Sequence, residues 1–232
     1  MITSPLLDEL APVVHGFGTR GDRMAELFPA WWAKRPIQHE RHGTRIAVVE
    51  RAGEDCGEAD GMFTDKPGLL LSIATADCAP VLLARWDGRQ VAALHVGWRG
   101  ALGGIVGQFA SLLHERGGNP ADWVAAVGPA AGPCCYEVPD ELVGQFHARH
   151  GIPTGLVAPR RGWLNLPGIV NWQLKRAGFG AVSACPECTI CHPGTPHGFA
   201  FHSYRRDRET RTPMVDVQWS VIAIANSRGQ NA

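Results

Sequence analysis

Three short apolar runs stand out near the middle of the chain, at residues 69–77, 80–86 and 91–96. Each has the length and composition of a buried strand, so the pattern predicts three strands with a turn between the last two. Cys78 directly follows the first run, and His95 lies near the end of the third. We therefore expect a thiol and an imidazole at neighbouring strand ends.

Helical periodicity follows these strands. The apolar positions that recur with this period after Ala101 are Leu102, Ile105, Val106, Phe109, Leu112 and Leu113. A Gly-Gly-Asn-Pro sequence at 117–120 ends the predicted helix. Further helices are predicted over 139–150 and 166–177, and further strands over 122–127 and 212–224.

Strands and helices therefore alternate along the chain. This order predicts a layered α/β architecture, because the apolar side of each element must be buried against another. We expect a single catalytic domain over residues 1–224. Residues 225–232 have the small, polar composition of a flexible tail.

Charge and composition narrow the range of partners. Twenty-two Lys and Arg balance twenty-two Asp and Glu, so no long-range field favours nucleic acid or an anionic membrane. A small-molecule substrate fits better. The N-terminal residues lack the pattern of a signal peptide, and no run is long enough to span a bilayer, so we expect a cytoplasmic protein. The sequence leaves the oligomeric state open.

Two roles fit the pairing of Cys78 with His95. They can be metal ligands, or a nucleophile and its base. Asp77 precedes the thiol, and we expect its charge to raise the pKa of Cys78 by like-charge repulsion. A raised pKa suits an unassisted nucleophile poorly, whereas bound zinc deprotonates a thiol outright, so this expectation favours a metal ligand.

Five sequence blocks together resemble the YfiH-type laccase-domain family. They are residues 59–64 (ADGMFT), 75–82 (TADCAPVL), 95–100 (HVGWRG), 128–138 (GPAAGPCCYEV) and 203–207 (SYRRD). The resemblance implies an α/β fold with a mixed β-sheet flanked by helices, related to cysteine-hydrolase-like proteins. It also implies a metal site formed by His42, Cys78 and His95. His39 is a competing ligand, because it lies close to His42 in the sequence.

Members of this family have been described in three ways: as polyphenol oxidases or laccases, as zinc-dependent purine nucleoside phosphorylases that also deaminate adenosine, and as peptidoglycan-editing factors. Two imidazoles and a thiolate with an open position form the ligand pattern of a catalytic zinc site. Copper can use the same ligands. The chain contains no His-x-His pair among its ten histidines, which argues against a multicopper oxidase.

Several arginines are candidates for binding phosphate. Arg99, Arg205 and Arg206 carry the paired donors and permanent charge that phosphate binding requires, and Tyr204 is a further substrate-binding candidate. Adjacent arginines are more often a solvated basic edge. We expect Arg99, Cys78 and His95 to be the catalytic residues.

The remaining cysteines suggest a second metal site. Cys185, Cys188 and Cys191, with His192 or His197, have a spacing that is compatible with structural zinc. The alternative is a loop of ordinary reduced thiols. Cys134 and Cys135 follow a Gly-Pro loop, and we expect them to be structural.

The leading hypothesis is a zinc-dependent purine nucleoside phosphorylase, which converts adenosine or inosine and phosphate to the base and ribose 1-phosphate, with an accompanying adenosine deaminase activity. One alternative is an amidase or hydrolase that edits peptidoglycan precursors, and another is a copper-dependent polyphenol oxidase. A non-enzymatic alternative is a binding domain with structural zinc. The sequence does not choose the physiological substrate or decide between zinc and copper.

Overall fold

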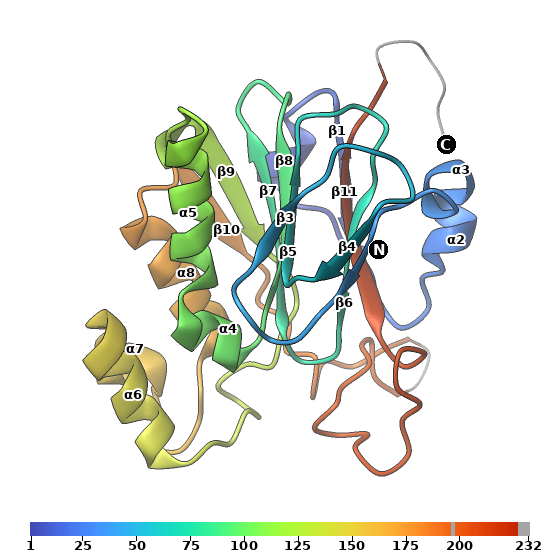
Figure 1. Cartoon of the computed structure of the whole chain (residues 1–232). Helices are drawn as coiled ribbons and strands as arrows, with labels where there is room; N and C mark the ends of the chain where they lie inside the picture. The colour runs from blue at the N-terminus through green and yellow to red at the C-terminus, as the bar shows by residue number, and fades with distance from the viewer. Residues whose placement is uncertain (196–197, 227–232) are drawn as a thin grey trace.

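Two main β-sheets pack face to face in the computed structural model, which describes residues 1–195 and 198–226 (Figure 1). The strands are β1 (Val13–Phe17), β2 (Ile37–His39), β3 (Ile46–Val48), β4 (Asp55–Glu58), β5 (Gly61–Thr64), β6 (Leu71–Thr75), β7 (Ala79–Arg85), β8 (Val91–Val96), β9 (Trp123–Val127), β10 (Ala181–Ala184) and β11 (Gln218–Ile224). The helices are α1 (Pro5–Asp8), α2 (Met24–Leu27), α3 (Pro29–Trp32), α4 (Trp98–Gly103), α5 (Ile105–Glu115), α6 (Asp140–His150), α7 (Thr154–Val157) and α8 (Leu166–Arg176), with a 3-10 turn at Pro120–Asp122.

The larger sheet is mixed, as expected. Its strand order is β10-β9-β7-β8-β5-β3; the outer pairs β10-β9 and β3-β5 are parallel, and the inner pairs are antiparallel. The second sheet has the order β1-β11-β6 and is antiparallel throughout, and β2 pairs with β4 separately. The observed α/β architecture therefore confirms the predicted fold class.

Alternation along β7 explains the layers. Val81 and Leu83 lie in the apolar cluster that the sheet shares with α5 and α8. Leu82 and Ala84 point to the opposite face and join the cluster between the two sheets. In Figure 1, helices α4, α5 and α8 cover one side of the larger sheet, while α2 and α3 lie outside the second sheet. Both faces of β7 are thus buried, which accounts for its continuous apolar run.

The predicted central elements are confirmed with small shifts. Strands β6, β8 and β9 fall within the predicted runs, and β7 begins one residue before its run. Helices α6 and α8 match the two later helices to within one residue. The helix predicted after Ala101 is divided in two, because Gly104 has φ +90° and separates α4 from α5. The five strands before residue 65 were not predicted, since most of them are short and only partly buried.

The closing strand is shorter than predicted. It begins at Gln218, so the prediction of a strand over 212–217 is wrong. Local hydrogen bonds form turns there instead, with the Thr212 amide donating to the Asp216 carboxylate over 2.6 Å. Residues 227–232 lie outside the described residues, and both the tail and the single domain over 1–224 stay predictions.

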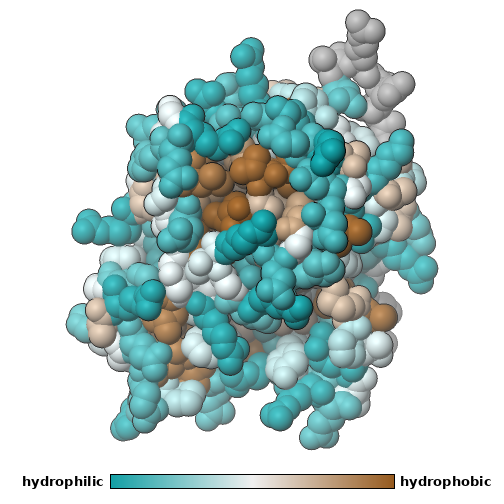
Figure 2. Space-filling model, in the orientation of Figure 1, coloured by the Kyte–Doolittle hydropathy of each residue, from teal (hydrophilic) through white to brown (hydrophobic). Residues whose placement is uncertain are grey.

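Large apolar side chains are mostly internal. They fall into three buried clusters, on the two sides of the larger sheet and on the outer side of the second sheet. In Figure 2 the visible face is mainly hydrophilic, and apolar side chains gather in a hollow in its upper half. Across the described ranges, every helix is too short or too polar to cross a lipid bilayer.

Candidate active site

The β7-β8 hairpin brings Cys78 and His95 to the same end of the larger sheet. The two strands are antiparallel, with Pro80 opposite His95, so the residue just before β7 lies beside the end of β8. His42 comes from the loop between β2 and β3. One ligand atom from each of His42, Cys78 and His95 lies within 4.8 Å of the others. This is the set of residues that the family resemblance implied.

His39 does not join this group. It lies at the end of β2 with an exposed side chain, and its Nε2 atom is 3.6 Å from the Asp55 carboxylate. The His42 ring instead meets the His95 ring edge to face, with centroids 4.8 Å apart. The geometry therefore favours His42 over His39 as the third member.

Asp60 organises the group, and sequence reasoning gave it no role. Its carboxylate lies 2.8 Å from Nδ1 of the buried His95 ring. It also accepts hydrogen bonds from the amides of Arg41, His42 and Gly43, over 3.1, 2.8 and 2.7 Å. His42 has φ +59°, in the left-handed region, and these bonds hold it there. A carboxylate that orients a histidine in this way is a common feature of metal sites.

The thiol and the imidazole favour each other's charged forms. Burial opposes the thiolate of Cys78, but the charge of His95 and a hydrogen bond with His42 outweigh it and lower the pKa of Cys78 to about 7. Burial also opposes the charged form of His95, yet Cys78, Glu40 and Asp60 raise its pKa well above the usual value. The metal-free group thus supports a thiolate-imidazolium pair once the pH rises above about 7.

The expected rise in the pKa of Cys78 is therefore wrong, because the two imidazoles lower it. The Asp77 carboxylate accepts hydrogen bonds from the hydroxyls of Thr189 and Ser203, over 2.7 and 3.0 Å, and from the Arg205 amide over 2.7 Å. Its own φ is +87°, which three partners from distant loops stabilise. Asp77 thus connects the loops of Thr189 and Ser203 to the start of the β7-β8 hairpin. The imidazoles of His42 and His95 lower the pKa of the Cys78 thiol.

A cavity of about 660 Å³ opens in front of the three residues. Its charged lining is five arginines and two carboxylates: Arg35, Arg41, Arg99, Arg205, Arg211, Glu40 and Asp77. Its large aromatic lining residues are Trp98, Tyr136, Tyr204 and Trp219. The excess of guanidinium groups suits an anionic ligand, and the aromatic faces suit a planar one.

The predicted arginines divide into two kinds. Arg99 and Arg205 line the cavity, as does Tyr204. Arg206 lies outside the lining, because its guanidinium donates to the carbonyls of Thr189, Ile190 and Phe201 and to both oxygens of Asp207. These bonds engage all of its donors, so the expected contact of Arg206 with substrate does not fit the structure.

Arg211 is a further cavity residue that sequence reasoning missed. Its guanidinium carbon lies 5.1 Å from the Tyr204 ring centroid, and its buried Nε atom has no hydrogen-bond partner in the described part of the chain. The guanidinium carbon of Arg99 lies 4.4 Å from the centroid of the Trp98 ring. Neither guanidinium pairs with a carboxylate among residues 1–195 and 198–226, so both can meet an anionic ligand.

The second cysteine cluster differs from the expected one. It consists of Cys134, Cys135, Cys188 and Cys191. Cys185 instead donates to the Glu187 carboxylate, and the His192 ring packs near Phe201 with centroids 5.8 Å apart. The prediction is thus wrong for Cys185 and His192, because the loop turns these side chains away, and His197 lies outside the described residues.

The mixed α/β fold and this site define the class of protein. Residues 23–221 match the family described as multi-copper polyphenol oxidoreductase laccase, and the chain belongs to this family. It is 34% identical over 207 residues to a protein of Geobacillus stearothermophilus named purine nucleoside phosphorylase YlmD, covering 80% of this chain and 74% of that protein. A Deinococcus radiodurans protein named purine nucleoside phosphorylase is 30% identical over 97% of this chain and 80% of its own length.

Solved structures agree with the fold. The crystal structure of YlmD from Geobacillus stearothermophilus superimposes with a TM-score of 0.79 at 27% identity, covering 96% of this chain and 94% of that one. The crystal structure of a hypothetical protein YfiH from Bacillus licheniformis gives a TM-score of 0.79 at 24% identity, with 94% of each chain covered. The overall fold is therefore shared with these two proteins.

Proposed function

We propose that this chain is a purine nucleoside phosphorylase whose active site is the cavity around His42, Cys78 and His95. The observation that carries the proposal is the convergence of this thiol-imidazole group with unpaired guanidinium groups and aromatic side chains in one cavity. Relatives with the name purine nucleoside phosphorylase support the same reaction.

The donor set fits zinc. Two imidazoles and one thiolate leave a position open toward the cavity, as catalytic zinc sites do, and Asp60 supports His95 as a carboxylate supports many zinc-bound histidines. When bound, zinc would supply a Lewis acid at the cavity wall. The low pKa of Cys78, about 7, keeps the thiolate available to a metal at neutral pH.

Phosphate and nucleoside would bind by different side chains. Arg99 and Arg211 would hold inorganic phosphate through paired N–H donors, with Arg205 beside them in the lining. Tyr204 and Trp219 would present flat faces to the purine base. A phosphate oxygen forms a bond to C1′ of the ribose while the bond from C1′ to the purine nitrogen breaks, and the base leaves with that electron pair. The arginines neutralise the attacking anion and fix its position.

Base release from inosine tests the proposal. The metal-loaded protein should release hypoxanthine and form ribose 1-phosphate only when phosphate is present. Cys78→Ser and His42→Ala should abolish the release, while His114→Ala serves as the matched control, because His114 is exposed on α5 and does not line the cavity. Phosphate-independent release, or full activity of Cys78→Ser, would contradict the proposal. With adenosine as substrate, formation of inosine reports the accompanying deaminase activity.

Copper-dependent phenol oxidation is the second candidate, because the family description names it. The site itself favours the first, since the cluster combines just two imidazoles with one thiol among the described residues, whereas a multicopper centre needs several histidines. Metal analysis of the purified protein, together with an oxygen-consumption assay on a simple phenol, separates the two. Copper with phenol-dependent oxygen uptake would favour the oxidase.

A further inference from the structure

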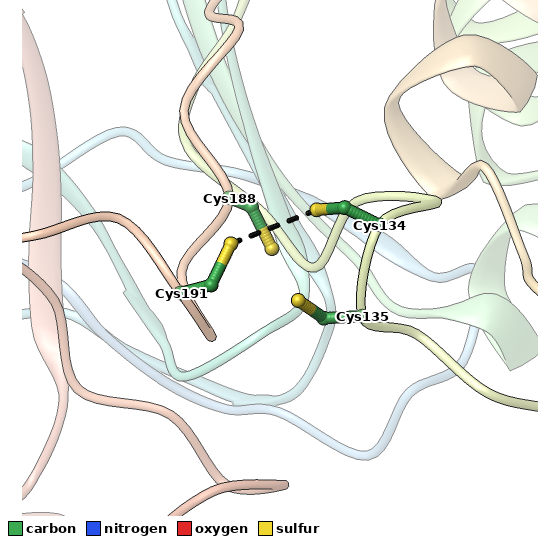
Figure 3. A group of neighbouring side chains, drawn as sticks. All are labelled: Cys134, Cys135, Cys188 and Cys191. Carbon is green, nitrogen blue, oxygen red and sulfur yellow. Dashed lines mark hydrogen bonds between the residues drawn. The ribbon is translucent and has the colours of Figure 1, made fainter.

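Four cysteine side chains converge at a second place, outside the lining of the cavity. Figure 3 shows the sulfur atoms of Cys134, Cys135, Cys188 and Cys191 pointing toward a common centre, and these atoms lie within 4.8 Å of one another. The first pair comes from the loop after β9 and the second from the loop after β10. The proposed function gives these residues no role.

The spacing of the sulfurs fits a metal ion better than a disulfide. Cys134 Sγ and Cys191 Sγ are 3.7 Å apart. Tetrahedral zinc with Zn–S bonds of about 2.3 Å places its sulfur ligands about 3.8 Å apart. A disulfide bond is only about 2.05 Å long, and all four cysteines are free thiols.

Backbone hydrogen bonds shape both loops around the cluster. The amides of Cys135 and Tyr136 donate to the Gly132 carbonyl over 3.0 and 2.9 Å, which forms a tight turn that presents the first two thiols. The Gly132 amide donates to Cys188 Sγ over 3.3 Å. Amide donors of this kind stabilise a thiolate, and the Cys-x-x-Cys spacing of 188 and 191 is common in structural zinc sites.

Arg206 supports the loop that carries Cys188 and Cys191. Its Nη1 atom donates to the carbonyls of Thr189 and Ile190, over 3.0 and 2.9 Å, and these residues lie between Cys188 and Cys191. Because this guanidinium already pairs with the Asp207 carboxylate, its part here is to fix the backbone of the loop. The residue expected to bind substrate thus holds the cysteine loop.

We propose that Cys134, Cys135, Cys188 and Cys191 bind a structural zinc ion that joins the loops after β9 and β10. The site is closed by four protein ligands, so its role is structural. Its loops carry residues that contact the cavity: Tyr136 follows Cys135 and lines the cavity wall, and Thr189 follows Cys188 and donates to Asp77. The ion therefore fixes one side of the cavity.

Metal content of single variants tests this site. We expect Cys134→Ser and Cys191→Ser, purified under nitrogen, each to contain one zinc ion fewer per chain than the wild type by elemental analysis. Cys185→Ser is the matched control and should keep the wild-type content, because its thiol lies outside the cluster. Wild-type zinc content in a folded Cys191→Ser variant would overturn the proposal, as would iron in place of zinc.

Two further measurements complete the test. The first does not require a variant to fold, and the second does not depend on metal at the site of His42, Cys78 and His95. Cobalt(II) exchanged into the intact wild-type protein should show the intense absorption of tetrahedral tetrathiolate coordination, and its absence would overturn the proposal. In a Cys78→Ser background, Cys191→Ser should still remove one zinc ion. That result is expected whether or not the first site binds metal. Failure of the proposed function can therefore be distinguished from failure of the zinc proposal. A Cys134-Cys191 disulfide in protein kept under nitrogen would also overturn the proposal.

Discussion

The Asp60 carboxylate lies 2.8 Å from Nδ1 of His95, so Nε2 is the ring nitrogen that can bind a metal. The same carboxylate accepts three amides of the His42 loop. One buried side chain thus positions two of the three candidate ligands, although Asp60 itself does not line the cavity.

Asp60→Asn should weaken metal binding. An amide offers one acceptor oxygen where the carboxylate offers two, so its NH2 group would face the amide of Gly43 or the ring of His95. We expect a roughly 10- to 100-fold loss of zinc affinity and a loss of about 1 to 3 kcal/mol in stability. Competition with a chelator and chemical unfolding measure the two effects. Asp55→Asn is the control, and equal affinities in wild type and Asp60→Asn would contradict the assigned role.

Gly97→Ala should separate the candidate ligands. A methyl group at Gly97 would lie 2.8 Å from His42 Cδ2 and 2.9 Å from Cys78 Sγ. The backbone of Gly97 has φ −78°, which alanine adopts readily, so the effect is steric. We expect loss of bound zinc and of activity with the fold retained, as measured by metal analysis and circular dichroism. Gly107→Ala is the control, because nothing lies within 4 Å of the added methyl.

Alkylation of Cys78 in the metal-free protein should depend on pH near neutrality. The lowered pKa of about 7 means that the thiolate, the reactive form, is lost as pH falls through 7. An ordinary thiol would lose reactivity near pH 8.5. Iodoacetamide labelling followed by peptide mass spectrometry locates the midpoint. His95→Ala should move the midpoint upward, because burial then acts with less opposition, and an unchanged midpoint would argue against the pairing.

Two arginines should respond differently to substitution by lysine. Arg206→Lys should lower the free energy of unfolding by about 2 to 3 kcal/mol. The reason is that a lysine ammonium cannot make all the hydrogen bonds that the guanidinium donates to three carbonyls and Asp207. Arg211→Lys should instead raise the KM for phosphate with little change in stability. Chemical denaturation and phosphate titrations in the inosine assay measure these effects. A normal phosphate KM in Arg211→Lys would remove that residue from the anion site.

The parts of the fold that could be predicted are those with strong local patterns. Strands β7 and β8 are buried on both faces, and α5 presents a continuous apolar side, so apolar spacing reveals them. Short strands such as β2 and β4 depend on pairing with each other, which no local pattern encodes. The divided helix depends on the left-handed backbone of Gly104.

Site prediction failed where residues meet across long stretches of sequence. Cys78 and His95 belong to one hairpin, so their proximity follows from local topology. Asp60 and His95 are 35 residues apart, and Cys134 and Cys191 are 57 apart. Their contacts depend on the order of strands in the sheet. The cysteine spacing did suggest a second site, but only the fold shows which thiols face each other.

The position of β11 in the second sheet has a consequence for synthesis. This strand lies between β1 and β6 and follows every other strand of the described residues, and its Trp219 lines the cavity. Until residues 218–224 leave the ribosome, β1 and β6 lack their shared partner and their apolar sides stay uncovered. The larger sheet and the helices that cover it can assemble earlier, since all strands of that sheet precede residue 185. The cavity therefore closes only after residues 218–224 have been synthesised.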